Sequence, residues 1–536
     1  MRTNESREGP IWNDAQLPAP SLLSGDTHAD VCVVGAGIAG LTTAYLLARD
    51  GKSVVVIDDG PVAGGQTHRT TAHLSNALDD RYFEIERLHG REGAHLAAES
   101  HSAAIDKIEA IVLAEQIDCG FERLDGYLFV PPGEPAELLD RELEAVLRTC
   151  AVRIDWAPRA PLEFDTGACL RFRGQGQFHP LKYLAGLARA IQRDGGRICT
   201  QTHAKHIQGG DGAKVTTAGG AVIYAGSVVV ATNSPVNDLV AIHTKQKAYL
   251  TYVIAARVPI GAVPHALYWD TGDPYHYVRL QPLAVPQPDD VAQSERAARA
   301  ESEELLIVGG EDHKTGQADD GPQRFDRLEA WARERFPAMG GIQHRWSGQV
   351  METIDGLAFI GRNPLDHDNV YIVTGDCGMG MTHGTIAGIL LTDLILGREN
   401  PWARLYDPAR KTVRAAGNFA RGLLNVAAQY VSLATPGEVD SCDDVRPGQG
   451  AVLRRGLTKH AVFRDSDGHL TELSAICPHL KCVVGWNQVE STWDCPCHGS
   501  RFTAQGKVIC GPANSDLEEI EEVVPTSTPN QSAWHR

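Results

Sequence analysis

The sequence predicts an α/β domain, an α+β domain interleaved with it, and a small all-β domain at the C-terminal end. A β-branched run at 29–34 leads directly into a glycine-rich turn and then into an apolar helix pattern at 41–49, which is typical of a parallel α/β sheet. Strand and helix patterns continue to about residue 400. After residue 439, short strand patterns and turns rich in Gly, Pro, Cys and His replace them, which favours an all-β domain.

Length and charge narrow the class of protein. A chain of 536 residues, 43% of them hydrophobic, is too long for one core, so we expect two to four domains. Its 68 acidic residues exceed its 50 basic residues and give a net charge of −18, which repels phosphate backbones and anionic lipid. We therefore expect no nucleic-acid partner. Because we find no signal-peptide pattern and no apolar run of membrane-spanning length, we expect a cytoplasmic protein with no membrane span.

A glycine motif follows the first strand and opens the first helix. Gly35, Gly37 and Gly40 form the pattern G-x-G-x-x-G: the first permits the tight turn, the second lets the backbone approach a pyrophosphate, and the third lets the helix pack close to the strand. Asp58 ends the second strand of this βαβ unit, where a carboxylate can accept hydrogen bonds from a ribose diol. The alternative is a chance glycine turn. The strand, helix and aspartate together favour a Rossmann-like dinucleotide site.

The rest of the α/β region alternates between two domains. Helix patterns cover 82–117, 134–150, 181–193 and 385–396, and strand patterns cover 228–232, 248–258 and 275–280. We expect a discontinuous dinucleotide-binding domain at 26–85, 181–235 and 345–400, a substrate domain at 86–180 and 236–344, a linker at 401–438, and a C-terminal domain at 439–526. The charged stretch 287–304 breaks the periodicity, and we expect a solvated loop or helix there.

Four further segments carry a family resemblance. They are Gly64-Gly-Gln-Thr-His-Arg-Thr-Thr, Val228-Val-Val-Ala-Thr-Asn-Ser-Pro, Thr353-Ile-Asp-Gly-Leu-Ala-Phe-Ile-Gly and Gly375-Asp-Cys-Gly-Met-Gly-Met-Thr. With them, residues 28–400 resemble the flavin-dependent amine and amino-acid oxidoreductases of the D-amino-acid oxidase and glycine oxidase type. The chain departs from that pattern at Asn233, which replaces a glycine. The resemblance implies FAD as the cofactor and a second sheet that covers the flavin.

The resemblance also implies which residues contact FAD. Relatives with covalent flavin need a Cys or His at particular places; the Cys position falls here at Gly348 or a neighbour without a thiol, and His68 is out of register. We therefore expect non-covalent FAD. Its expected contacts are Gly35, Gly37, Ile38, Ala39, Gly40, Asp58, Asp59, Arg69, Thr70, Thr71, Ala204, Ala231, Thr232, Gly378, Met379, Gly380, Met381 and Thr382.

Six of the chain's 12 cysteines lie between Cys442 and Cys510, and this enrichment indicates a metal site. Two loops, Cys477-Pro-His and Cys495-Pro-Cys-His, each supply one thiol and one imidazole. The alternative is structural zinc, for which two Cys and two His suffice, although zinc loops normally pair like ligands. The loops, with the segments Gly-Ser-Arg-Phe and Cys-Gly-Pro-Ala that follow, resemble a Rieske domain. The resemblance implies a 2Fe-2S cluster held by Cys477, His479, Cys495 and His498.

Two more cysteines, Cys482 and Cys497, lie close to these ligands in the sequence. Their positions resemble those of respiratory-type Rieske proteins, which carry a disulfide between the cluster loops, and we expect that disulfide here. The alternative is a pair of buried thiols, which a reducing cytoplasm favours. A shielded disulfide persists there if its potential is low.

A flavin site and a Rieske cluster in one chain predict an electron path, because flavin takes two electrons as a hydride and the cluster passes them singly. The other glycine clusters do not join a strand to a helix, so we expect a small organic substrate to supply the electrons. The resemblance implies oxidation of a C–N bond in an amine, N-methyl compound or amino acid, although hydroxy acids are also oxidised in this superfamily. The expected acceptor is a one-electron carrier: a ferredoxin, a cytochrome or an oxygenase component.

Two other functions fit the same motifs. One is a reductase that takes electrons from NAD(P)H and serves an oxygenase partner. The other is an oxidase that passes electrons to oxygen.

The candidate catalytic residues are on strands of the second sheet. Arg279 would bind a substrate carboxylate, Tyr277 would orient it, and His276 or His313 would take a proton from the substrate nitrogen. The alternative is the ordinary polarity of strands and turns.

Overall fold

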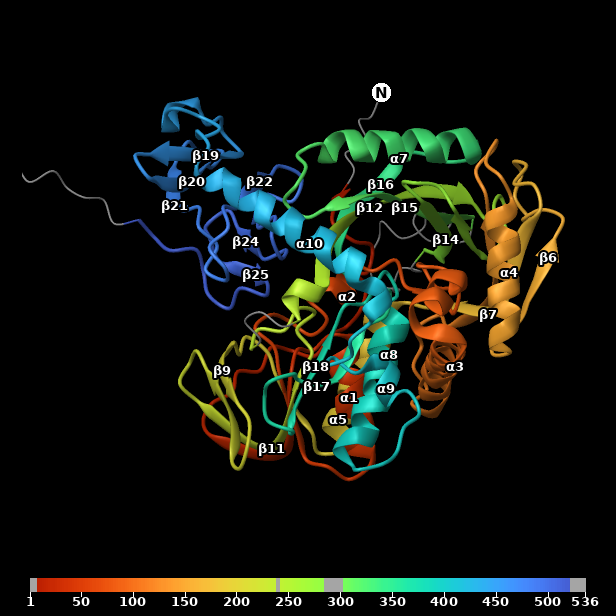
Figure 1. Cartoon of the computed structure of the whole chain (residues 1–536), viewed down its shortest axis with the longest axis horizontal. Coiled ribbons are helices and arrows are strands. Elements are labelled where there is room, and N and C mark those ends of the chain that lie inside the picture. The colour runs from red at the N-terminus through yellow and green to blue at the C-terminus, as the bar shows by residue number, and fades with distance from the viewer. Residues whose placement is uncertain (1–6, 238–241, 284–301, 521–536) are drawn as a thin grey trace, which may run out of the picture.

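The computed structural model describes residues 7–237, 242–283 and 302–520, and it contains two large sheets and a small C-terminal β domain (Figure 1). The stretch 287–301, expected as a solvated loop or helix, lies outside these residues, and Glu303 already begins a strand. The predicted fold class is confirmed: a Rossmann-like α/β unit, an interleaved α+β unit and a small all-β domain follow the expected order.

The dinucleotide unit is an eight-stranded sheet whose central strands run parallel in the order β18-β11-β2-β3-β8. These strands are short runs of Val and Ile that are buried on both faces, as parallel strands are. The unit consists of β2 (Thr27–Val34), α1 (Ile38–Arg49), β3 (Val54–Ile57), α5 (Pro180–Arg193), β8 (Arg197–Cys199), β9 (Ala204–Gln208), β10 (Ala213–Thr217), β11 (Val222–Val230), β17 (Phe359–Arg362), β18 (Val370–Thr374) and α8 (Gly380–Ile395).

The second sheet has ten strands in the order β1-β16-β12-β15-β14-β13-β5-β7-β4, with β6 beside β7. Helix α7 covers one face at β12 and β15, as the green helix in Figure 1 shows. The strands are β1 (Arg7–Glu8), β4 (His73–Leu74), β5 (Glu122–Phe129), β6 (Ile154–Ala157), β7 (Cys169–Gln177), β12 (Gln246–Pro259), β13 (Leu267–Asp270), β14 (His276–Pro282), β15 (Glu303–Lys314) and β16 (Ile342–Thr353). Its helices are α2 (Gln66–Arg69), α3 (Tyr82–Ala114), α4 (Glu137–Thr149) and α7 (Gly321–Arg335). Strand β16 continues past residue 344, the boundary expected from the sequence.

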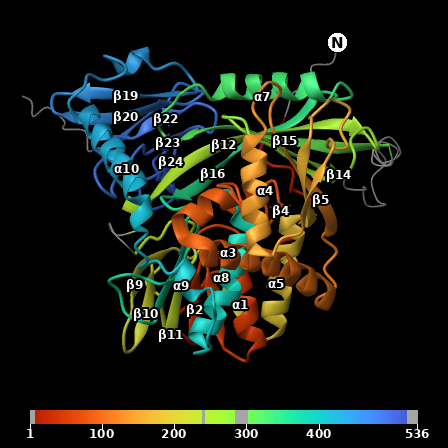
Figure 2. The same ribbon diagram turned by 45° about the vertical axis from the view of Figure 1, so that its right-hand side comes forward.

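The segment expected as a linker, 401–438, contains α9 (Ala403–Tyr406), α10 (Ala416–Gln429) and the 3₁₀ turn η3 (Tyr430–Leu433). In both views α10 extends from the side of the dinucleotide unit to the C-terminal domain (Figures 1 and 2). That domain has two small antiparallel sheets, β19 (Gln449–Arg455), β20 (Thr458–Arg464) and β21 (Leu470–Ser474), then β22 (Gly485–Asn487), β23 (Thr492–Asp494), β24 (Arg501–Thr503) and β25 (Val508–Cys510). The connecting segment is thus largely helical rather than an open tether.

Candidate functional site

One large cavity, of about 490 Å³, lies where the two sheets and the C-terminal domain meet. Of the 18 residues expected to contact a dinucleotide, all but Gly40 and Thr382 line it. Gly40 instead packs against the turn, and the Thr382 hydroxyl contacts Nδ1 of His101 at 2.8 Å. The C-terminal domain supplies part of the wall through Glu490, Thr492, Arg501, Val508, Ile509, Cys510, Gly511, Ala513 and Asn514.

The glycine turn is closed by backbone contacts that leave no room for side chains. Gly35 has φ +110°, and a Cβ there would collide with the Ala231 carbonyl oxygen. A Cβ on Gly40 would overlap the carbonyl oxygen of Gly35. Helix α1 begins at N-cap Gly37, and its first residues, Ile38 and Ala39, line the cavity, so the start of this helix offers a site for an anionic group. This cradle fits the pyrophosphate of a dinucleotide.

Asp58 holds the same turn. Its Oδ2 accepts a hydrogen bond from the Ala36 N–H at 2.7 Å, and its Oδ1 accepts one from the Gly60 N–H at 2.8 Å. Burial raises the pKa of this carboxyl, and the two N–H donors counter part of the rise. Each carboxylate oxygen keeps a second lone pair, so Asp58 can brace the turn and still face a ribose.

The far wall at this end of the cavity is shared between domains. His203 Nδ1 lies 3.4 Å from Asp59 Oδ2, and that hydrogen bond raises the pKa of the imidazole. Asn514, from the C-terminal domain, donates from Nδ2 to the Ala204 carbonyl at 3.0 Å. Ala204 is one of the residues expected to contact FAD, so the C-terminal domain helps to close this end. Sequence reasoning missed Asn514: it directly follows the Cys-Gly-Pro-Ala segment, but that motif indicates the cluster domain and not a contact with the dinucleotide end.

The opposite end of the cavity is aromatic and acidic. Tyr275, Tyr277 and Trp269 line it together with Thr251 and Asp79. The Tyr277 hydroxyl lies 2.9 Å from Thr251 Oγ1. Burial raises the pKa values of both tyrosines well above their ordinary range, so their phenols stay protonated at neutral pH and serve as hydrogen-bond donors.

Four carboxyl groups gather around this end, and sequence reasoning found none of them. Asp79 and Asp80 precede α3, Asp312 is on β15 and Glu352 is on β16. Burial and the neighbouring Asp79 charge raise the pKa of Asp80 and of Asp312 to about 7. Burial and the charges of Asp80 and Asp79 raise the pKa of Glu352 to about 8. The four acids come from segments far apart in the chain, so no local sequence pattern predicts that they lie together.

The four residues expected to be catalytic do not come together at the cavity. Tyr277 lines the cavity. Arg279, on the same face of β14, is fully buried and donates to the carbonyls of Thr71 and Ala72 rather than lining the cavity.

The two histidines are on the opposite face, under α7. His276 Nδ1 lies 2.9 Å from Asp270 Oδ2 and its ring stacks on Trp331, while the His313 ring stacks on Tyr252. Successive side chains of a strand point to opposite faces, so His276 points away from Tyr277. His313 lies on the same face as His276 because the pairing of β12 with β15 shifts register between Leu250 and Tyr252.

The ligand set expected for a cluster converges at one end of the C-terminal domain. The Cys477 and Cys495 thiols hydrogen-bond to each other, and both are buried. The His479 and His498 rings lie 5.1 Å apart, centre to centre. Nδ1 of His498 is buried and has no hydrogen-bond partner among the described residues. Two thiols and two imidazoles, with one nitrogen unpaired, fit a Rieske 2Fe-2S cluster.

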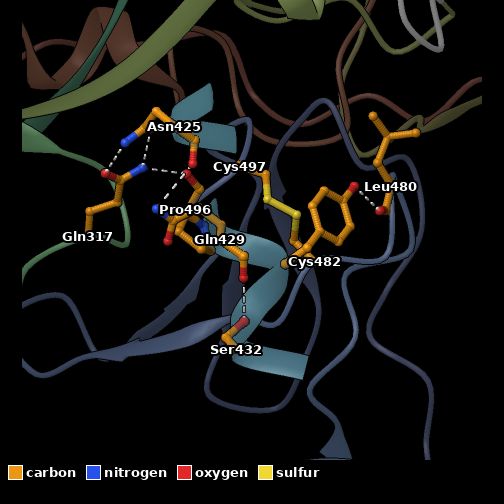
Figure 3. Close-up of a disulfide and its surroundings, with 9 residues drawn as sticks. Gln317, Asn425, Gln429, Ser432, Leu480, Cys482, Pro496 and Cys497 are labelled. Carbon is orange, nitrogen blue, oxygen red and sulfur yellow. Dashed lines mark hydrogen bonds between the residues drawn. A yellow bond between two sulfur atoms is a disulfide. The ribbon is translucent and has the colours of Figure 1, made fainter. Parts of the chain in front are cut away.

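A disulfide joins Cys482 to Cys497 and so ties the two ligand loops together (Figure 3). Cys495 Sγ lies within 4.8 Å of both sulfurs of the disulfide, so the disulfide is next to the expected ligand Cys495. The loops are also held from two other segments: the Tyr430 hydroxyl, in the connecting segment, donates to the Leu480 carbonyl at 2.6 Å, and Gln317 Nε2, just after β15, donates to the Pro496 carbonyl at 2.9 Å.

The cluster end faces the flavin side of the molecule. The ring of His243, from the turn η1 (His243–Lys245) before β12, lies 4.9 Å from the His479 ring and 6.4 Å from the His498 ring. His498 is only 5% exposed. The structure thus covers His498 and leaves His479 partly exposed. Within the described residues, no helix is both long and apolar enough to cross a membrane.

Comparisons with known proteins agree with this architecture. The family model of FAD dependent oxidoreductases (DAO) matches residues 30–394, and the model of the Rieske [2Fe-2S] domain matches residues 435–521. A Rieske 2Fe-2S iron-sulfur protein of Bacillus subtilis, YhfW, is 32% identical over 524 residues, which cover 96% of this chain and 98% of that protein.

Two other matches concern the flavin part. The gamma-glutamylputrescine oxidoreductase of Escherichia coli is 28% identical over 387 residues, covering 70% of this chain and 85% of that one. The crystal structure of glycine oxidase from Geobacillus kaustophilus superposes with a TM-score of 0.56 at 18% identity, covering 72% of this chain and 99% of that one. At that identity the likeness concerns the fold.

Proposed function

Because this chain belongs to the DAO family of FAD-dependent oxidoreductases and carries a C-terminal Rieske [2Fe-2S] domain, we propose that it is a dehydrogenase for a small amine. The electrons pass from FAD to the Rieske cluster and then to an external one-electron acceptor such as a ferredoxin, a cytochrome or an oxygenase component. One observation carries this proposal: the wall of the dinucleotide cavity is built partly by the domain that holds the cluster ligands.

In this proposal the chain holds two redox groups. The glycine turn, Asp58 and the start of α1 hold FAD, which supplies hydride acceptance from a C–H bond. Cys477, Cys495, His479 and His498 hold the cluster, which supplies one-electron transfer.

The acidic end of the cavity favours an amine over an amino acid. The arginines that line the cavity already have partners: Arg69 pairs with Glu490 at 2.8 Å, Arg81 donates to the Leu78 carbonyl and Arg501 pairs with Asp494. Two of the three arginines are thus paired with carboxylates, and the third donates to a backbone carbonyl. At the acidic end, a bound ammonium group would favour the ionised form of the neighbouring carboxyls and so be stabilised by them.

Three side chains would then act on the substrate. Tyr277 donates a hydrogen bond that orients it, and Trp269 excludes water from one side. Asp312 does not line the cavity but hydrogen-bonds to Thr251, which does, and its pKa is about 7. Through the Thr251 hydroxyl it can take up the proton released when a substrate ammonium is converted to the free amine. The free amine, with its nitrogen lone pair, is the form that can be oxidised.

Two alternatives stay open to experiment: a reductase fed by NAD(P)H, and an oxidase. Purified protein is mixed without oxygen with NADH, NADPH and a panel of primary, secondary and N-methyl amines and amino acids, and the flavin absorbance band is followed. Fast bleaching by an amine but not by either nicotinamide supports the proposal. Stoichiometric fast bleaching by NADH would reject it, and rapid peroxide formation in air with an oxidised cluster would favour the oxidase.

A further inference from the structure

One buried glutamine joins the flavin cavity to the cluster-ligand loop. Gln349, on β16, lines the dinucleotide cavity and is 3% exposed. Its Nε2 donates to the Gly499 carbonyl at 2.8 Å, and its Oε1 accepts a hydrogen bond from Cys510 Sγ at 3.0 Å. Both partners belong to the C-terminal domain, and Gly499 directly follows His498, one of the four residues assigned to the cluster.

The main chain of Gln349 is fixed on the other side of the same contact. Its N–H donates to Gln66 Oε1 at 2.8 Å, and Gln66 also lines the cavity and begins α2. One residue therefore joins the cavity wall, through its backbone, to the cluster-ligand loop, through its side chain. A buried amide with both ends bonded is costly to replace, because its partners would be left without hydrogen bonds.

Glycines on both sides let the domains approach this closely. Gly499 has φ +80°, and a Cβ there would collide with Ala248 Cβ on β12 and lie 2.9 Å from Gln349 Nε2. Gly316, which follows β15, has φ +70°, and its Cβ would lie 2.9 Å from the Asp494 carbonyl oxygen, just before the ligand Cys495. The ligand loop and the second sheet are thus in direct backbone contact.

We propose that Gln349 is the positioning residue that holds the cluster-ligand loop 495–499 against the flavin cavity and thereby sets the rate of electron transfer between the two sites. This inference rests on the proposed electron path. Each crossing takes one electron from reduced flavin and gives it to the oxidised cluster. An external acceptor takes that electron from the cluster, and a second crossing completes the oxidation of the flavin, whose protons leave to solvent.

The test uses the full chain loaded with both groups and needs no substrate. The flavin is reduced by a light pulse with a sacrificial donor in the absence of oxygen, and cluster reduction is followed by visible absorbance and by electron paramagnetic resonance. The variant Gln349→Met removes the amide at similar length. Gln343→Met, on the same strand, is the matched control; its side chain donates to the Gly341 carbonyl at 3.0 Å and makes no hydrogen bond to the described part of the C-terminal domain.

We expect Gln349→Met to slow cluster reduction about tenfold or more, with both groups fully bound, because the ligand loop loses its anchor. The control should match the unaltered chain. If Gln349→Met loses either group, Gln349→Asn, which withdraws the amide by one methylene, takes its place with the same expectation.

Equal rates in the Gln349 variants and the unaltered chain would overturn the inference alone. A cluster that light-reduced flavin fails to reduce even in the unaltered chain would overturn the proposed electron path together with it.

Discussion

The two ends of the flavin cavity are built in different ways. The dinucleotide end is made of backbone: glycines 35 and 40 close the turn, and the N–H groups of Ala36 and Gly60 are bound by one carboxylate. The substrate end is made of side chains from separate segments, and its carboxyl groups have raised pKa values. A backbone site requires a local motif, whereas a side-chain site can be assembled from any strands that the fold brings together. The first end is therefore specified by short sequence motifs and the second by tertiary structure.

The largest expected effect is at the dinucleotide end. Gly40→Val places a side chain on the carbonyl oxygen of Gly35, so the turn must open. We expect loss of bound flavin and a destabilisation of about 3 kcal/mol or more. Flavin absorbance of the purified protein and thermal unfolding measure both. Gly417→Val adds the same side chain at a helix glycine with open space around it and is the control. If Gly40→Val retains flavin, the close contact between Gly40 and Gly35 is not required for flavin binding.

An intermediate effect is expected from the carboxyl groups of the substrate end. Glu352 has a pKa of about 8 in the folded chain against 4.5 ordinarily, so the folded state favours its protonated form. Its contribution to stability is present below about pH 4.5 and is lost as the pH rises through about 8. Glu352→Gln should therefore leave stability unchanged at pH 4.5 and raise it by about 1 kcal/mol or more at pH 9.

Thermal unfolding of Glu352→Gln across this pH range provides the measurement, with the exposed Glu334→Gln as the control. A stabilisation that does not grow with pH would mean that burial does not raise the pKa of Glu352.

The smallest effect is expected where the C-terminal domain touches the dinucleotide end. Asn514→Ala removes the hydrogen bond to the Ala204 carbonyl, and we expect FAD affinity to fall about fivefold, equivalent to about 1 kcal/mol. Titration of flavin-free protein with FAD measures the Kd. Asn369→Ala removes similar bonds to the carbonyls of Gly210 and Gly226 and should leave the Kd unchanged. Equal affinities for all three proteins would mean that the C-terminal domain only covers this end without supporting it.

The same contrast explains what the sequence could predict. The βαβ unit, the helices from 82 and 181, and the small β domain were expected from periodicity and motifs, and the structure has them. The helix α10 was missed because a short amphipathic run between two domains looks like a connector until its packing partners are known. Its contacts with the cluster loops come from the tertiary structure.

At the site, predictions based on motifs and those based on residue type fared differently. Sixteen of the 18 residues chosen from glycine and flavin motifs line the cavity. His276, Arg279 and His313 were chosen because their side chains could do chemistry, and they do not line it. The sequence places them on strands but does not show which face of each strand meets the flavin, and Asp79 and Asp312 gave no local signal at all.

The central claim is that substrate electrons enter at the flavin and leave through the Rieske cluster of the same chain. Rapid mixing without oxygen tests it most directly: an amine that reduces the flavin is mixed with the unaltered chain and with His498→Ala, which lacks one of the four proposed cluster ligands. We predict that the flavin band bleaches first and the cluster signal follows in the unaltered chain. In His498→Ala the flavin should bleach at the same rate while turnover with one-electron acceptors is lost. Cluster reduction before flavin bleaching, or unchanged turnover in His498→Ala, would contradict the account.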